Sequence, residues 1–140
     1  MSDANFTKLE RVQYSLARVV TGMPVYSREH MMPVLAKLHW LPIRAWVSFK
    51  IATTIFKVRQ TGQPSYLGNS SKMLFHHGRY GLQQVAKCTL KESRTVLCYG
   101  TRAFRQTAAK TWNSLPDDVR RADKLETFRS RLKTHLYILS

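Results

Sequence analysis

Asp117 and Asp118 are the one pair of adjacent carboxylates in this chain, so they are the first residues to test for chemistry. Paired carboxylates can hold the two divalent metal ions that polymerases and nucleases use for phosphoryl transfer. Here the pair follows Pro116 and precedes a helical pattern, and acidic side chains favour the first turn of a helix. Residues 30–91 contain no Asp or Glu. That stretch therefore supplies no carboxylate ligands for a metal ion. We therefore interpret the pair as a helix start and predict no catalytic residue.

Metal-ligating side chains form a second group. Structural zinc sites usually pair their ligands a few residues apart, and the residues to consider here are His76, His77, Cys88 and Cys98. The histidines are adjacent and the cysteines are widely spaced, which favours buried thiols over ligands. A nucleophile pair of Cys98 with His39 lacks a residue to orient it. We predict no metal and no cofactor.

Basic residues are a clearer indication of function. The 140 residues include 23 Lys or Arg and 8 Asp or Glu, a formal net charge of +15. Between His30 and Pro116, Glu92 is the sole acidic residue. Such a field attracts phosphate backbones without reading bases. RNA and/or DNA is therefore the leading partner, with an acidic membrane surface as the alternative. No apolar run reaches about eighteen residues, so we expect no membrane span. With nucleic acid as the preferred polyanion, we predict no membrane partner.

Helical periodicity organises the first third of the chain. A helix is predicted from Phe6 to Val20, ended by Gly22 and Pro24. Arg11 and Arg18 fall on the face opposite its predicted core face, which comprises Phe6, Leu9, Val12, Leu16 and Val20. A short helix is predicted from Pro33, after which His39 caps the last carbonyls and Trp40 packs in the core.

The most apolar helix is predicted from Ile43 to Arg59, with apolar residues on two faces. Trp46, Lys50 and Lys57 lie between those faces. Such an arrangement can form an aromatic and basic strip that binds nucleic acid. A tryptophan packed at an edge beside two solvated lysines is the commoner arrangement and the favoured interpretation.

The C-terminal part predicts two helix starts. Ser114 is expected to cap a short helix over 115–121, and Asp123 to start a longer one. The longer helix is predicted to dock an apolar stripe of Leu125, Phe128, Leu132, Leu136 and Leu139. Basic side chains border that stripe on both sides, where their stems can cover apolar surface while their charges point outward.

Together these patterns give a set of candidate phosphate or base contacts. The candidate nucleic-acid-binding residues are Arg11, Arg18, Trp46, Lys50, Lys57, Arg94, Arg102, Arg105, Arg120, Arg121, Arg129, Arg131 and Lys133.

The predicted fold class is mainly α with a small β-hairpin (α+β). Two short strands are expected over 82–88 and 94–99, before a helix near 102–113. The expected organisation is an N-terminal helical part (1–61), a loop or linker (62–81), and a hairpin with C-terminal helices (82–140). One domain, or a fragment of one, accounts for this length.

Five ordered motifs support a family resemblance. They are Leu9-Glu10-Arg11-Val12-Gln13 with Arg18 and Val20-Thr21-Gly22; Leu38-His39-Trp40-Leu41-Pro42 with Arg44, Phe49 and Lys50; Pro64 with Tyr66-Leu67; Tyr99-Gly100, Arg102-Ala103-Phe104 and Trp112-Asn113-Ser114-Leu115-Pro116; and 128–137. In this order they resemble the C-terminal end of the reverse-transcriptase polyprotein of non-LTR (LINE-type) retrotransposons. The most similar groups of these elements are the jockey-like and chicken-repeat-like clades. The stretch 70–80 matches only loosely.

The resemblance implies a piece that lies after the catalytic palm, around the end of the thumb. Such a fragment of an RNA-directed DNA polymerase is not an enzyme on its own. It implies RNA or target DNA and the rest of the polyprotein as partners, in an intracellular protein that is nuclear with cytoplasmic assembly. The alternatives are a purely structural packing module, which exposed apolar surface would favour, or a decayed element fragment without activity.

Overall fold

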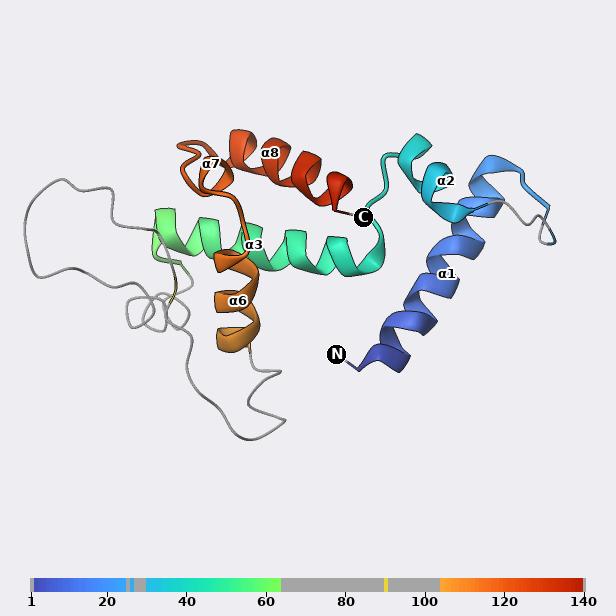
Figure 1. The fold of residues 1–140 in the computed structure, drawn as a ribbon, viewed down its shortest axis with the longest axis horizontal. Helices are drawn as coiled ribbons and strands as arrows, with labels where there is room; N and C mark the ends of the chain where they lie inside the picture. The colour runs from blue at the N-terminus through green and yellow to red at the C-terminus, as the bar shows by residue number, and fades with distance from the viewer. Residues whose placement is uncertain (1, 25, 27–29, 64–89, 91–103, 140) are drawn as a thin grey trace, which may run out of the picture. The chain divides into compact units, whose positions relative to one another are not determined.

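Helices account for most of the described chain. The structure is a computed structural model that describes residues 2–24, 26, 30–63, 90 and 104–139. Its helices are α1 (Asp3–Thr21), α2 (Met31–Lys37), α3 (Ile43–Thr61), α6 (Phe104–Asn113), α7 (Asp117–Arg120) and α8 (Leu125–Ile138) (Figure 1). The mainly helical class is confirmed for these residues. The predicted hairpin over 82–99, apart from Leu90, and most of the 62–81 linker lie outside them.

The chain divides into two compact units. The first unit comprises Met1–Phe49 and Lys133–Ser140, and the second comprises Lys50–Leu132. Helices α3 and α8 therefore each contribute residues to both units. The predicted organisation into 1–61, 62–81 and 82–140 stays a prediction.

An aromatic stack forms the core of the second unit. The Phe56 and Phe128 rings stack with centroids 4.3 Å apart, and the Trp112 ring also stacks on Phe128, with centroids 5.8 Å apart. Trp112 and Phe128 are fully buried. Within this unit, the last part of α3 and the first part of α8 lie side by side in opposite directions (Figure 1). The predicted core stripe of α8 is confirmed at Phe128 and Leu132 here, and at Leu136 in the first unit. Leu125 is partly buried, and the prediction is wrong at Leu139, which follows the last residue of α8 and is 69% exposed.

Asn113 ties the end of α6 to the backbone of Leu90. Its side-chain oxygen accepts from the Leu90 N–H at 2.8 Å, and its amide nitrogen donates to the Leu90 carbonyl at 2.9 Å. The Asn113 carboxamide thus pairs with both the N–H and the carbonyl of Leu90, whose side chain is buried. Because buried backbone groups must be paired, this contact fixes Leu90 in the core.

The helix starts near the C-terminus differ from the predicted capping. The Ser114 hydroxyl donates back to the Thr111 carbonyl at 2.9 Å, and Pro116 is the N-cap residue before α7, which begins at Asp117. The predicted Ser114 cap is therefore wrong, because the hydroxyl satisfies a carbonyl at the end of α6 instead. Asp117 and Asp118 do occupy the first turn of α7, as expected for a helix start. Helix α8 begins at Leu125, two residues after Asp123.

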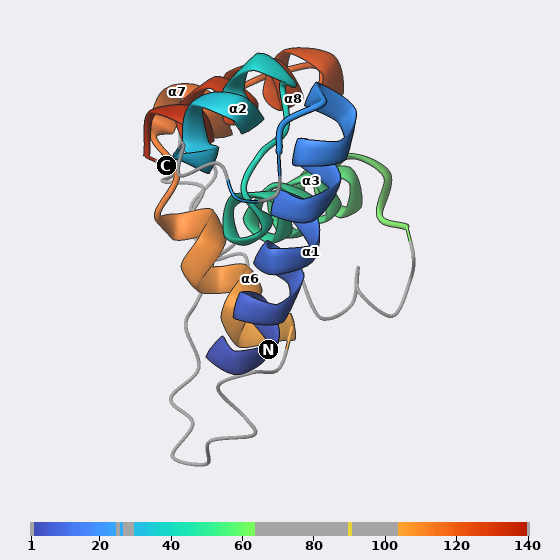
Figure 2. The ribbon, with the colours of Figure 1, turned by 90° about the vertical axis from the view of Figure 1, so that its right-hand side faces the viewer.

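In the first unit, α2 packs against the last turns of α1 (Figure 2). The buried cluster contains Ala17, Met31, Val34 and Leu35, with Tyr14 and Trp40 packed at its edge. Ala17 is fully buried, and its small side chain allows α2 to approach α1 closely. Gln13 adds a polar tie by donating to the Leu41 carbonyl at 2.8 Å.

The predicted core face of α1 is wrong. The side of α1 that packs within its unit carries Gln13, Tyr14 and Ala17, not the apolar stripe expected from periodicity. Four of the five predicted core residues are exposed, together with Val19. The exposed apolar residues of α1 are Leu9, Val12, Leu16, Val19 and Val20, which we name the α1 stripe. Only Phe6 of the predicted set is partly buried.

Helix α2 ends in a Schellman motif centred on His39. The Trp40 N–H donates to the Leu35 carbonyl, and the His39 N–H donates to the Ala36 carbonyl. This motif requires a left-handed residue, and His39 has φ 55°, where glycine is usual. The end of α2 is capped by the backbone of this segment. Trp40 packs beside Leu35 as the hydrophobic contact of the motif.

Candidate nucleic-acid interface

Ion pairs neutralise much of the acidic charge in the described residues. In the first unit, the Arg44 guanidinium lies 3.1 Å from the Asp3 carboxylate and 3.2 Å from that of Glu10. The hydrogen bond that Arg44 donates to Asp3 is the main reason that the pKa of Arg44 is raised. Arg44 also lies over the Phe6 ring, 4.8 Å from its centroid. One arginine therefore contacts two carboxylates and joins the start of α3 to α1.

In the second unit, Asp117 and Asp118 are each paired to an arginine. Arg120 bonds to Asp117 through its guanidinium, and its side chain is almost fully buried. Arg131 lies 3.0 Å from the Asp118 carboxylate and also donates to the Asp118 carbonyl at 2.8 Å. Arg120 is thus an ion-pair partner within the fold, and its burial argues against the predicted phosphate contact. This pair is not among the contacts predicted from the sequence, although Asp117 and Arg120 lie three residues apart on one helix, a spacing at which side chains of opposite charge meet.

The remaining cations of the second unit are exposed. Lys50 and Lys57 lie seven residues apart on α3, and both side chains are open to solvent, as are those of Arg121 and Arg129. Neither Arg121 nor Arg129 forms an ion pair within the described part of the chain. Phosphate can therefore reach all four of these predicted residues.

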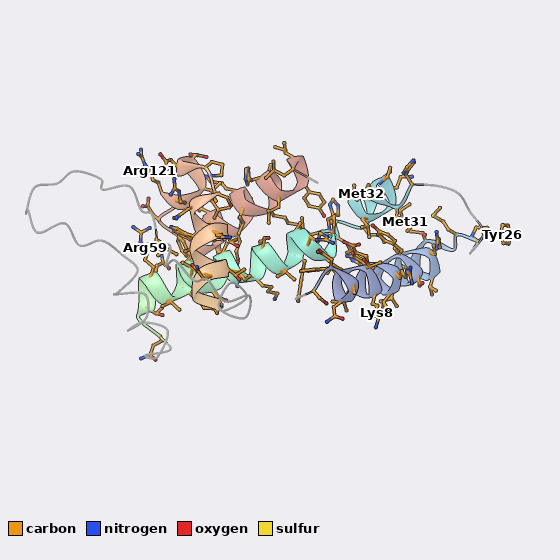
Figure 3. All side chains as sticks on the ribbon, turned by 60° about the horizontal axis from the view of Figure 1, so that its bottom comes forward. Lys8, Tyr26, Met31, Met32, Arg59 and Arg121 are labelled. Carbon is orange, nitrogen blue, oxygen red and sulfur yellow. The ribbon has the colours of Figure 1, made fainter. Side chains whose placement is uncertain are left out.

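Two further cations belong to the same surface but were not among the predicted contacts. Gln60 donates to the Asp123 carbonyl at 2.7 Å, which brings the end of α3 to the segment that precedes α8. Arg59 and Lys124 flank this contact in sequence, and both are exposed. Figure 3 shows Arg59 and Arg121 at the same end of the view. Sequence position alone does not predict the contact between these two segments, because Gln60 and Asp123 lie far apart in the chain.

In the first unit, α1 presents a basic edge beside its apolar stripe. Arg11 is exposed and Arg18 is partly buried, with its Nε shielded from solvent. Lys8, which was not among the predicted contacts, projects away from α1 (Figure 3). The two acidic residues of α1, Asp3 and Glu10, are those bound by Arg44. The solvent side of this helix is therefore apolar and positive.

Two predicted residues from distant segments meet at one cavity in the first unit. Trp46 and Lys133 both line an open cavity of about 480 Å³, together with Gln13, His39, Trp40 and Phe49. Trp46 is 48% exposed, whereas Trp40 is largely covered by the core cluster. Lys133 lies 5.9 Å from the Tyr137 ring centroid. An aromatic face and a cation thus share one concave site.

Some predicted residues cannot be placed. Arg94 and Arg102 lie outside the described residues, as do His76, His77, Cys88 and Cys98. Arg105 belongs to α6, but its side chain is not described. Within the described part, no group of three or more potential metal ligands occurs. None of the described helices combines the length and apolar character needed to cross a bilayer.

Comparison with known proteins adds no relative. No protein-family model matches this chain, and no curated protein and no solved structure was found to match it.

Proposed function

We propose that this chain is a non-catalytic C-terminal module of a LINE-type reverse transcriptase, which holds template RNA or target DNA beside the polymerase. The proposal rests on the five ordered motifs and on the basic surface. In this role the chain supplies phosphate contacts, and the polymerase chemistry belongs to another part of the polyprotein. Its other partner is the remainder of that polyprotein.

The observation that carries the nucleic-acid role is how the charges are distributed. Arg44, Arg120 and Arg131 bind four carboxylates: Asp3, Glu10, Asp117 and Asp118. Most of the other described cations, including Lys57, Arg121 and Arg129, remain exposed to solvent. These pairs leave the net charge unchanged, but they hold four of the described carboxylates beside arginines, so the exposed cations elsewhere on the described surface have few acidic neighbours. Such a surface favours polyanions.

The test is charge reversal at exposed positions. The double variant Arg121→Glu/Arg129→Glu should weaken binding to single-stranded RNA and duplex DNA alike, because phosphate contacts carry no sequence information. In a salt titration, the slope of log K against log salt should decrease by about 0.9 for each phosphate that the protein no longer neutralises on duplex DNA, and by about 0.7 on a single strand. Fluorescence anisotropy at several salt concentrations measures both quantities.

The matched control changes two charges without changing the net charge. Arg44→Gln combined with Glu10→Gln removes one cation, which is not among the predicted contacts, and one of its carboxylate partners. This variant should bind close to the parent. If the charge-reversed double variant also binds like the parent at moderate salt, the nucleic-acid role is wrong.

A second candidate function is a packing module for the polymerase, and the α1 stripe favours it. Contiguous apolar surface of this kind commonly marks a protein interface. Leu9, Val12 and Leu16 follow one another at spacings of three and four residues, which suits docking against another helix. Under this function the basic charge is a by-product of an environment that handles nucleic acid.

The packing function has its own test. The polypeptide encoded upstream in the same reading frame should bind this chain, and Leu9→Gln/Leu16→Gln should abolish that binding while circular dichroism stays unchanged. The control is Lys8→Gln, which changes the basic edge and leaves the stripe intact. Unchanged binding by the double glutamine variant would exclude the α1 stripe as the interface.

A further inference from the structure

The cavity in the first unit differs in chemistry from the rest of the basic surface. Trp46 offers a half-exposed indole, and Lys133 and His39 provide polar, nitrogen-bearing groups at the same site. No carboxylate of the described residues lines it. Its volume of about 480 Å³ lies in the range of about 300–1,000 Å³ that is typical of sites for small ligands. The site therefore suits a flat, partly apolar group attached to an anion.

A neighbouring cavity in the same unit provides a contrast. It has a similar volume, about 410 Å³, but Glu10 and Arg44 both line it. Arg44 already bonds to Glu10 and Asp3, so its charge is balanced internally. Of these two cavities, the one at Trp46 holds positive charge that no lining acid balances. This difference selects the Trp46 cavity as the place where an anion-bearing ring would bind.

The backbone at His39 gives independent support for a built site. His39 holds φ 55°, a left-handed conformation that costs a non-glycine residue about 1–2 kcal/mol. Glycine would satisfy the same Schellman motif without that cost. The imidazole is nevertheless present at the cavity, where it adds a ring and two nitrogen atoms. Conformational cost of this kind concentrates at functional sites.

We propose that this cavity binds an unpaired nucleobase, which stacks on Trp46 while Lys133 contacts the adjacent phosphate. This inference rests on the proposed nucleic-acid function and makes it more specific, because it predicts a preference for single strands over duplex. Bases in a duplex are already stacked and paired, so their faces are not open to the indole. Stacking on an aromatic side chain tolerates any base.

The experiment compares strands that differ only in their bases. The probes are oligouridylate, oligothymidylate, an abasic strand with the same number of phosphates, and a duplex of the same length. The base-containing strands should bind on the order of tenfold more tightly than the abasic strand. Tryptophan fluorescence should be quenched by the base-containing strands and not by the abasic strand.

Variants then assign the effect to the cavity. Trp46→Ala should reduce the affinity for oligouridylate and oligothymidylate to the abasic level, and Trp46→Phe should restore most of the loss because it keeps an aromatic face. Lys133→Gln should weaken binding to all strands equally, because it removes a phosphate contact. The matched control is Tyr26→Ala, which removes an aromatic residue that is 88% exposed and does not line the cavity. It should change no affinity.

The outcomes separate this inference from the function on which it rests. Equal affinity for base-containing and abasic strands, or tighter binding to duplex, would overturn the base site and leave the phosphate-binding function standing. Failure to bind any of the probes would overturn both. A preference for oligouridylate supports template RNA as the source of the base, and a preference for oligothymidylate supports a target DNA strand.

Discussion

Among the described residues, the second unit buries most of its large apolar side chains, with Phe104 as the exception at 42% exposed, and the first unit leaves many of its own exposed. Trp112 and Phe128 are fully buried in the second unit, where they stack together with Phe56 of α3. In the first unit, Val12 and Leu16 of α1 are more than half exposed. Both sets have helical spacing in the sequence. Periodicity therefore identifies a helix face that can be buried, but the position of other elements decides whether this chain buries it.

This difference has a functional meaning. The second unit has an aromatic core and exposed cations among its described residues, an arrangement that is compatible with the proposed phosphate-binding role. The first unit combines an uncovered apolar stripe with an open aromatic cavity. Surfaces of that kind are where partners and ligands bind. The following predictions test this contrast, from the largest expected effect to the smallest.

Truncation of the second unit's central ring should have the largest effect. Phe128→Ala removes the ring that stacks on both Phe56 and Trp112, and should lower the free energy of unfolding by about 3–5 kcal/mol. Leu16→Ala in the α1 stripe should change it by no more than about 0.5 kcal/mol, because that side chain is 53% exposed. Chemical denaturation followed by circular dichroism measures both values. Equal losses for the two variants would show that the stripe is buried in solution and would remove the contrast.

The Asn113 contact tests whether the second unit's core depends on Leu90. Asn113→Ala removes both hydrogen bonds to the Leu90 backbone and leaves two buried polar groups unpaired. The expected loss is about 1–3 kcal/mol in unfolding free energy, with faster hydrogen exchange at the Leu90 amide. Ser114→Ala is the control, since its hydroxyl bonds only to an exposed carbonyl. A loss at Ser114 as large as that at Asn113 would contradict this account.

The sequence predicts where the helices lie along the chain better than it predicts which faces of them pack together, and the reason is physical. Local periodicity and Gly22 suffice to locate α1, and the stripe on α8 is covered largely as predicted. The face of α1 is not predicted, because the small Ala17 and the polar Gln13 decide where α2 and Leu41 pack. Such pairing depends on the three-dimensional fit between elements.

The candidate site shows the same limit. Trp46 and Lys133 are each predicted from local pattern, but their shared cavity arises only because distant segments fold into one unit. Arg120 is the opposite case. It is predicted as a phosphate contact, but it pairs with Asp117 and its side chain is almost fully buried. Residue type indicates which groups can bind phosphate, and packing decides which of them remain accessible.

Substitution of His39, the left-handed residue in the first unit, should have a smaller effect on the free energy of unfolding, and it should stabilise the protein. His39→Gly should raise the free energy of unfolding by about 0.5–1 kcal/mol. The backbone relief of about 1–2 kcal/mol exceeds the loss of about 0.5–1 kcal/mol from glycine's greater freedom in the unfolded chain. Thermal unfolding measures this gain in stability. The stability of His39→Asn should fall between those of the parent and His39→Gly, because asparagine tolerates the left-handed conformation. A destabilised glycine variant would show that the imidazole makes a contact that stabilises the fold.

Tyr137 gives the smallest effect, and it depends on pH. Its hydroxyl is buried with no hydrogen-bond partner within the described residues, and burial raises the pKa of Tyr137 above 10.0. Because the folded state holds the proton more tightly, its contribution to stability is complete below pH 10 and is lost as pH rises through the raised pKa. Tyr137→Phe removes the unpaired hydroxyl, so it should be neutral or slightly stabilising at pH 7 and should flatten the decline in stability above pH 10. Denaturation midpoints of the two proteins across this range give the comparison, with Tyr26→Phe as the control for an exposed tyrosine. Parallel curves for parent and Tyr137→Phe would mean that the phenol is solvated, and that this part of the first unit is as open as the α1 stripe.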